Sequence, residues 1–559
     1  MNNDAVLHTK QEKFSFSSFV CNIFLLLSSI ILFTLPQPNL FVHTGLPFFA
    51  FFQLIPLFIL VQRISWKFFW LWGFAYGFGC YAFYAYWLGA FHPLGIAVIA
   101  SLYGIYLLLA FPFLKAAPLF FKKNGWLVQW VIWCAYEYVK TCGFSGFDYG
   151  VSGYAMWQSP VFLQSASIAG VWGVSALITF PSAWLSGIIC KYCQTKKENN
   201  GEKTSAIITK NIFTQKISAL VWIVFLCAAI IYGIKSPVDY SGDKTVKIAL
   251  VQPNNDPWRG GFEAYSQNLD SLIKLSDEAL ASDSEIGLVV WPETAFVPRI
   301  EWHYKYRQER NKFLLVERLL TYLDNAPVPF LIGNDHAVLD YSRSGKYEAV
   351  DYNSALLFRP GENCLPPAAE IYSKMHLVPF TEYFPYEKIF PRLYQGLLNG
   401  DTHLWEPGNT PVVFDAAGFK FGVPICFEDT FGEDCRRFVN NGAQAFVNIS
   451  NDAWSHSLAC QYQHLSMAVF RCVENRVPAV RATASGQTCM VDPNGKVLEM
   501  AEPFKETWLV TEIPVSENSQ KTIYTRYGDF VGKFFAIMAF MLFVFGIAKT
   551  VLSKKSKEK

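Results

Sequence analysis

Apolar residues occur in long stretches over the first 235 residues and again near the end of the chain. A helix needs about twenty consecutive apolar residues to cross the hydrocarbon core of a bilayer. The pattern therefore predicts eight membrane-spanning helices, at residues 17–35, 46–62, 68–89, 94–114, 126–140, 161–189, 217–235 and 530–552. The composition agrees, because 52% of the residues are hydrophobic and only 16% are charged, whereas soluble domains are about one-quarter charged.

The pattern changes between residues 245 and 515, where short β-rich runs end in polar residues. Runs rich in Val, Ile and Phe, bounded by Pro, Gly, Asn and Asp, predict buried strands. These runs are 246–254, 286–294, 329–337, 354–360, 420–429, 443–452 and 488–499. Helix-like stretches at 262–282, 306–324 and 459–475 lie between several of them. Strands that alternate with helices indicate a layered α/β domain.

Along the chain, connections that contain lysine or arginine alternate with connections that contain neither. They occur before the first span, in the connections 63–67, 115–123 and 191–216, and in the C-terminal tail. The connections 36–45, 90–93 and 141–160 contain neither residue type. Because cytoplasmic connections are enriched in these residues, we expect both termini in the cytoplasm.

This orientation divides the chain into three parts. Residues 1–235 would form a membrane domain of seven helices, 236–529 an extracytoplasmic domain, and 530–559 the eighth helix with a basic cytoplasmic tail. In a bacterium the middle domain would lie on the periplasmic side of the inner membrane. Glu137 and Asp148 place ionisable groups near the interface, where such groups commonly line a cavity or pair internally. They favour a lipid-handling role for the helices, with anchoring alone as the alternative.

The charge and the cysteine pattern exclude some classes of function. A net charge of +2 gives no indication of nucleic-acid binding. The thirteen cysteines show no regular CxxC pattern, and the nine histidines show no metal-ligand spacing such as HExxH. We therefore expect neither a metal nor another cofactor.

Three reactive side chains lie in distinctive settings. Cys426 ends the apolar run of FGVPICFEDT, Glu293 follows a predicted strand in VVWPETAF, and Lys374 lies in the Pro- and aromatic-rich run YSKMHLVPFTEYFP. A cysteine nucleophile needs a stabilised thiolate, a group that transfers protons, and donors for the oxyanion. Taken alone, Cys426 is more typical of a buried small hydrophobe, and spacing alone does not bring the three residues together.

The motifs around these residues occur in a characteristic order. WPET, KMHLVPFTEYFP, GVPICFE and NISNDAW follow one another along the chain. They resemble the signature segments of the nitrilase superfamily, and within it those of the membrane-embedded apolipoprotein N-acyltransferases. Eight spans, with the soluble domain between the seventh and eighth, also match that branch. The resemblance implies a multi-span α-helical membrane domain joined to a nitrilase-like α-β-β-α sandwich.

The resemblance also implies roles for particular residues. The Glu-Lys-Cys triad of the family corresponds to Glu293 as general base and acid, Lys374 as the cation that stabilises thiolate and oxyanion, and Cys426 as the acyl carrier. Glu382 and Glu428 match two supporting acids.

The position after the nucleophile departs from the family pattern. Tyrosine is frequent there, whereas this chain has Phe427, which keeps the ring and the backbone N–H but lacks the hydroxyl. Trp258 and Asn451 match candidate substrate-binding positions. For Asn451 the alternative is a role in holding its own loop.

The function implied is the transfer of an acyl chain from a phospholipid, phosphatidylethanolamine in this family, to the α-amine of a diacylglyceryl-cysteine of apolipoproteins. One complete triad requires no partner chain, so a monomer is expected. A membrane-anchored nitrilase-type amidase and a non-catalytic lipoprotein-binding protein are the alternatives. The aromatic loops 255–262 and 384–405 fit either flaps at the membrane surface or segments that pack on the domain itself.

Overall fold

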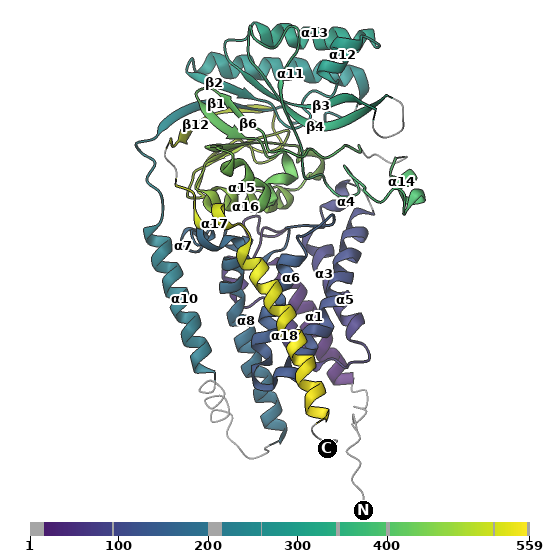
Figure 1. Cartoon of the computed structure of the whole chain (residues 1–559), viewed down its shortest axis with the longest axis vertical. Helices are drawn as coiled ribbons and strands as arrows, with labels where there is room; N and C mark the ends of the chain where they lie inside the picture. The colour runs from purple at the N-terminus through teal and green to yellow at the C-terminus, as the bar shows by residue number, and fades with distance from the viewer. Residues whose placement is uncertain are drawn as a thin grey trace, which may run out of the picture.

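The computed structural model describes residues 16–91, 94–198, 215–258, 260–341, 347–398, 403–517 and 520–555. A layered sheet domain sits on one end of a bundle of helices (Figure 1). Several basic segments used to predict the orientation, namely residues 1–15, 199–214 and 556–559, lie outside the described residues. Residues 92 and 93 of the connection 90–93 lie outside them as well.

Five helical runs among the described residues are long and apolar enough to cross a membrane. They are Phe16–Thr34 (α1), Gly95–Val139 (α5, Gly95–Phe121, with α6, Gly125–Val139), Ala166–Thr195 within α8 (Ala166–Glu198), Lys216–Lys235 (α10) and Phe530–Ser553 within α18 (Phe530–Lys555). The expected spans at 46–62 and 68–89 correspond to shorter helices, α2 (Ile55–Arg63) after a 3-10 turn, and α3 (Phe69–Tyr84). The count of eight spans therefore remains a prediction, while the structure shows a helical N-terminal region with several apolar helices.

Helix α10 illustrates why these helices need a lipid environment. It stands beside the bundle rather than inside it (Figure 1). Its apolar side chains are largely uncovered, with Ile217 72%, Phe225 65% and Ile234 66% exposed. An apolar helix surface of this kind is stable only against hydrocarbon or another apolar partner.

The sheet domain contains two six-stranded sheets with related topology. The first has the order β12-β1-β2-β3-β4-β5 and the second the order β11-β10-β9-β8-β7-β6. Strands β1, β2 and β3 pair in parallel, as do β7, β8 and β9, and the outer pairs are antiparallel. The strands are β1 (Lys244–Gln252), β2 (Ile286–Val290), β3 (Phe330–Asp340), β4 (Glu348–Phe358), β5 (Glu370–Ser373), β6 (Val413–Ala416), β7 (Phe419–Gly422), β8 (Ala445–Ser450), β9 (Ala479–Thr483), β10 (Cys489–Val491), β11 (Val497–Met500) and β12 (Thr507–Val515).

The apolar side chains of β1 explain how the layers are held together. Ile248 and Leu250 belong to the core that contains the second sheet, whereas Ala249 and Val251 contact the core of the helices on the outer face. Successive side chains of a strand point to opposite faces, so one apolar run serves both layers. Each fully buried aliphatic side chain of this kind contributes about 1.5–3 kcal/mol.

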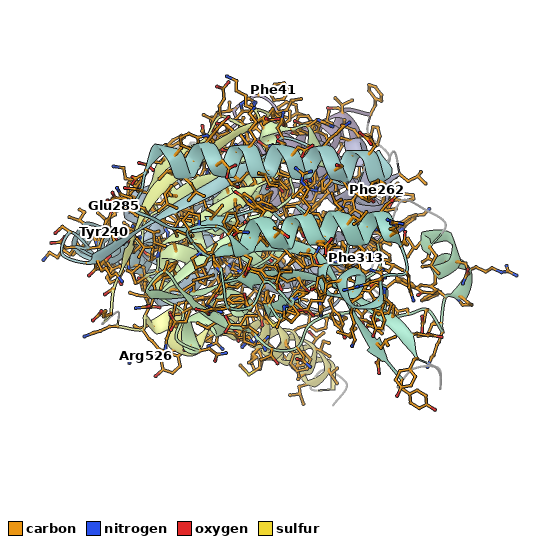
Figure 2. All side chains as sticks on the ribbon, turned by 90° about the horizontal axis from the view of Figure 1, so that it is seen from above. Phe41, Tyr240, Phe262, Glu285, Phe313 and Arg526 are labelled. Carbon is orange, nitrogen blue, oxygen red and sulfur yellow. The ribbon has the colours of Figure 1, made fainter. Side chains whose placement is uncertain are left out.

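Helices complete the sandwich on both outer faces. Helices α11 (Gly261–Ser282) and α13 (Arg310–Asp324) cover the first sheet. Figure 2 shows them side by side from above, with Phe262 near the start of one and Phe313 near the start of the other. Helices α15 (Gly432–Asn440) and α16 (Leu458–Asn475) lie between the second sheet and the bundle (Figure 1). The α-β-β-α order implied by the resemblance is confirmed.

Several predicted elements have different bounds. The run 420–429 is not one strand, because β7 ends at Gly422 and the chain turns at Cys426 into a 3-10 turn, Cys426–Thr430. The run 488–499 is a hairpin of β10 and β11, and the stretch 306–324 is interrupted between α12 (Ile300–Tyr306) and α13. Strands β5, β6, β9 and β12 were not predicted.

Helix α16 connects the sheet domain to the bundle. The indole N–H of Trp87 donates to Gln463 Oε1 at 2.9 Å, and the amide of Gln463 donates to the carbonyl of Pro38 at 2.9 Å. The hydroxyls of Tyr86 and Ser457 lie 2.9 Å apart. These buried bonds fix the sheet domain against the helices near their shared interface.

Candidate active site

Glu293 and Lys374 form a buried ion pair at the edge of the first sheet. Lys374 Nζ lies 3.1 Å from Glu293 Oε1, and the lysine side chain is fully buried. Glu293 follows β2, and Lys374 continues β5, where its N–H donates to the carbonyl of Asn353 at 2.8 Å. The side-chain amide of Asn353 also donates to Glu293 Oε1, at 2.8 Å. The neighbouring strand β4 therefore orients both partners.

A glycine on β3 permits this approach. A Cβ atom at Gly333 would lie 2.3 Å from the carbonyl oxygen of Pro292 and 2.7 Å from Glu293 Cα. Such distances are far below van der Waals contact, so the glycine lets the segment with Glu293 lie directly against the strand.

Lys374 has a second carboxylate partner. Its Nζ lies 2.9 Å from Glu382 Oε1, while Glu382 Oε2 accepts the N–H of Val378 at 2.9 Å. Burial by itself would lower the pKa of the Lys374 ammonium, but the charges of Glu293 and Glu382 raise it above its ordinary value. Lys374 is therefore a permanent cation at neutral pH.

Cys426 lies at a strained turn next to this pair. It is half-buried, and its φ of 48° lies in the left-handed region, which is unusual for a residue with a side chain. Such backbone strain occurs often at functional sites. Burial and the charge of Glu293 raise the pKa of the thiol, whereas Lys374 opposes the increase. The resting thiol is therefore protonated, and a base is required to activate it.

Glu428 connects the turn at Cys426 to the segment that contains Lys374. Its Oε2 accepts the N–H of Ile425 at 2.7 Å. Its Oε1 accepts the N–H groups of Met375 at 2.6 Å and His376 at 3.1 Å, and the hydroxyl of Tyr372 at 2.8 Å. The carboxylate therefore positions the segments on both sides of the site without contacting the thiol.

Phe427 forms a wall between the site and the bundle. Its ring is 6% exposed and lies 4.9 Å from the ring of Phe431, 5.8 Å from His376 and 6.3 Å from Phe147. Its N–H belongs to the first residues of a 3-10 turn, where backbone N–H groups lack partners within the helix.

The two candidate substrate-binding residues have different surroundings. The N–H of Asn451 donates to Glu293 Oε2 at 3.0 Å, while its side-chain oxygen accepts the N–H of Ala453 at 3.2 Å. The loop-holding alternative therefore describes its side chain. Trp258 stacks on His403 with ring centroids 3.8 Å apart and lies 6.0 Å from Trp405.

A buried ionic network next to the turn at Cys426 was not predicted. His464 on α16 contacts Asp429 and Asp452, and Asp429 also contacts Arg481. All four side chains are at most 5% exposed. The sequence signals were a histidine in an apolar helix and an arginine in a buried strand, and neither indicates its partners. Asn353 was also missed, although it is a polar residue within a strand.

Comparisons with known proteins match both parts of the chain to described families. Residues 247–521 match the carbon-nitrogen hydrolase family, and residues 29–184 match the apolipoprotein N-acyltransferase N-terminal domain. The class of the sheet domain is therefore that of the carbon-nitrogen hydrolases. A mutant of the Nesterenkonia AN1 amidase from the nitrilase superfamily aligns over 52% of this chain and 93% of its own, at 16% identity and a TM-score of 0.34.

Relatives over the whole length narrow the assignment. Apolipoprotein N-acyltransferase 1 of Treponema denticola is 44% identical over 530 residues, which are 93% of this chain and 95% of that protein. Apolipoprotein N-acyltransferase 1 of Treponema pallidum is 44% identical over 526 residues, 94% of this chain and 95% of that protein. The chain belongs to the apolipoprotein N-acyltransferase family.

Proposed function

We propose that the protein is an N-acyltransferase that moves an acyl chain from a membrane phospholipid, through a thioester on Cys426, to the α-amine of the diacylglyceryl-cysteine of apolipoproteins. The observation that carries the proposal is the buried contact of Lys374 with Glu293, 3.1 Å long, next to a cysteine whose turn is strained. The membership in the family supports the substrate classes.

The first half-reaction loads the cysteine. Glu293 takes the proton from the thiol, and the sulfur of Cys426 attacks the ester carbonyl of the phospholipid. Lys374 and the N–H of Phe427 stabilise the oxyanion that forms. The intermediate collapses to the thioester, and Glu293 returns the proton to the departing alkoxide of the lysophospholipid.

The second half-reaction transfers the chain. The α-amine of the acceptor attacks the thioester carbonyl while Glu293 removes a proton from the attacking nitrogen. The same two donors stabilise the second oxyanion, and the amide forms as the Cys426 thiolate leaves. Glu293 then returns the proton to the sulfur. Water must be kept away between the two steps, because hydrolysis of the thioester would waste the acyl chain.

The arrangement in the membrane follows the sequence prediction. The proposal includes eight spans, both termini in the cytoplasm, a membrane domain at 1–235, a periplasmic catalytic domain at 236–529 and a final helix with its tail at 530–559, in a bacterial inner membrane. It also includes phosphatidylethanolamine as donor and a monomeric enzyme. A reporter fused near residue 400 should be active only outside the cytoplasm, and cytoplasmic activity would overturn this orientation.

The decisive experiment follows the acyl group. Purified protein incubated with acyl-labelled phospholipid should carry one added acyl mass on the peptide that contains Cys426, and Cys426→Ala should carry none. Hydrolysis of small amides without this adduct would favour the amidase alternative. Complementation of an acyltransferase-depleted strain by Cys426→Ala would favour the non-catalytic alternative.

A further inference from the structure

A cavity lies at the junction of the sheet domain and the helix bundle. Its volume is about 390 Å³. Its walls come from the end of α6, the connection 141–160, α8, the segment after the nucleophile, and the region where α17 (Ile523–Tyr527) leads into α18. The residues that carry the argument are Asp148, Asp529, His376, Phe431, Trp172 and Lys533.

Asp148 has an unpartnered oxygen at this cavity. The residue is only 3% exposed, and its Oδ1 lies 3.4 Å from the hydroxyl of Tyr154. Its Oδ2 is buried and accepts no hydrogen bond from any described residue. The charges of Arg471 and Lys140 attract it, but neither donates to it. Lys140 donates to the Tyr81 hydroxyl and to two backbone carbonyls, and Arg471 donates to Thr430, Tyr154 and Glu474. A buried carboxylate that lacks partners is costly.

A second carboxylate faces the same space. Asp529 Oδ1 accepts the indole N–H of Trp172 at 2.8 Å and the hydroxyl of Tyr524 at 2.7 Å. Burial raises the pKa of Asp148 to about 7, and the charge of Asp529 adds to the increase. A cation held between the two would offset this penalty and favour the ionised form of Asp148.

The other charged groups around the cavity largely neutralise one another. Among the described residues that line the cavity, the one Lys or Arg besides Arg471 is Lys533, which is exposed on α18. Within the cavity lining Asp148 and Asp529 therefore outnumber Lys533, while Arg471 and Lys140, which lies outside the lining, also attract Asp148. The paired groups are Glu433 with Arg436, Asp434 with Arg437, and Arg471 with Glu474.

The cavity is close to both the nucleophile and the membrane. His376 and Phe431, in its wall, contact the ring of Phe427, which directly follows Cys426. Helix α6 ends at Val139 and α18 begins at Phe530, so the cavity lies where apolar helices meet the sheet domain (Figure 1). Lipid headgroups occupy this level of a bilayer.

We propose that this cavity binds the ammonium group of a zwitterionic phospholipid headgroup, through Asp148 and Asp529, while the acyl ester of the same lipid reaches Cys426. The inference rests on the proposed function and adds the site that selects the donor. The proposal requires the phosphate and glycerol of the bound lipid to reach from the cavity, around the ring of Phe427, to the thiol of Cys426. An amine on the acceptor has the same chemistry and is the other source of the cation.

The donor lipid and the acceptor amine enter in different half-reactions, so measuring each half-reaction separately shows which of them supplies the cation. Full-length protein in mixed micelles at pH 8 is given phosphatidylethanolamine or phosphatidylglycerol with identical acyl chains, without acceptor, and thioester formation is timed. We expect Asp148→Asn to slow loading from phosphatidylethanolamine by about tenfold, the effect of one charge-assisted contact, and to leave loading from phosphatidylglycerol unchanged. Asp529→Asn, which keeps the Oδ1 acceptor, should act in the same direction. Asp277→Asn, at a surface carboxylate of α11, is the matched control.

Other outcomes overturn the assignment in distinguishable ways. Equal loading from both lipids by the wild type and by Asp148→Asn would exclude headgroup selection here, although the acyltransferase would stand. If Asp148→Asn slowed only the transfer of the acyl chain from the preformed thioester, the bound cation would be the amine of the acceptor. Failure of every phospholipid to load Cys426 would instead refute the proposed function. A binding role also predicts that Asp148→Asn keeps or raises the unfolding temperature, whereas a structural role predicts a decrease.

Discussion

The imidazole Nε2 of His464 lies 3.2 Å from the carbonyl oxygen of Cys426 and 2.7 Å from Asp429 Oδ1. On the other side of the ring, Nδ1 lies 3.2 Å from Asp452. Both ring nitrogens thus face acceptors, which an imidazolium satisfies as a double donor. Burial would lower the pKa of His464, but the charge and hydrogen bonds of Asp452 and the Cys426 carbonyl raise it. A cation therefore holds the strained turn from beneath.

Replacement of His464 should affect the turn more than substrate binding. His464→Gln retains one donor, so we expect thioester formation to fall by at least about tenfold with little change in donor KM. Because a buried ion pair is broken, the free energy of unfolding should fall by about 3–5 kcal/mol. Rates of Cys426 alkylation and thermal unfolding test this. Unchanged alkylation in a destabilised variant would assign His464 to the core alone.

The same residue predicts a pH dependence of stability. The pKa of His464 in the folded state is above its ordinary value of 6.5. Its stabilising contribution is therefore fully present below pH 6.5 and is lost as pH rises through the raised value. Denaturant unfolding from pH 6 to pH 9 should show a steeper loss of stability for the wild type than for His464→Gln. Parallel curves would contradict the imidazolium assignment.

Lys374 should be indispensable for reasons of both charge and shape. Lys374→Met removes an oxyanion donor, which costs about 10²–10³ in rate, and leaves Glu293 and Glu382 as two buried carboxylates without their cation. Lys374→Arg should not restore thioester formation, because a planar guanidinium does not fit the place of an ammonium. The acyl-enzyme assay tests both variants. Near-normal loading by Lys374→Met would remove the residue from the mechanism.

Glu428 should control activity through the geometry of two segments. Burial raises its pKa to about 7, and only the ionised carboxylate accepts all four of its donors. Loading of the wild type should rise with pH through about 7, whereas Glu428→Gln should be slow, by about 30-fold or more, and lack this inflection. An unchanged inflection in the variant would assign it to another group.

Protonation of Glu428 should have opposite effects on the stability of the protein and on its activity. The pKa of Glu428 in the folded protein is above its ordinary value of 4.5, so the protonated form favours folding. That contribution is present below pH 4.5 and is lost as pH rises through about 7. This contribution is measured by comparing the free energy of unfolding of Glu428→Gln with that of the wild type across this pH range.

Phe427 should act through its ring and its backbone. Phe427→Ala removes a buried aromatic side chain and should lower the free energy of unfolding by about 3–5 kcal/mol. Phe427→Tyr adds a hydroxyl to a wall of aromatic rings, so we expect a smaller loss of about 1–3 kcal/mol and thioester formation within about threefold of the wild type. A large gain in rate for Phe427→Tyr would show that the hydroxyl has a catalytic task that this chain lacks.

Elements with a strong local pattern can be predicted from the sequence alone. Apolar stretches predicted the long helices, and apolar runs bounded by polar residues predicted β1, β2, β3 and β8, because burial on both faces of a central strand requires continuous apolar residues. The missed strands β5, β6 and β12 lie at sheet edges, where partial burial leaves a weaker signal. The central strand β9 was also missed, because Arg481 interrupts its short apolar run. The ordered motifs also named the triad, but only through resemblance.

The contacts between polar groups that are distant in sequence depend on how the chain folds in three dimensions. Asn353 reaches Glu293, His464 reaches the Cys426 carbonyl, and Asp148 shares a cavity with Asp529. Each pair is separated by tens to hundreds of residues, and its contact depends on the packing of sheets and helices against one another. Hydrogen bonds and ion pairs act over a few ångströms. A linear pattern records which residues are polar, but their distances exist only in the folded chain.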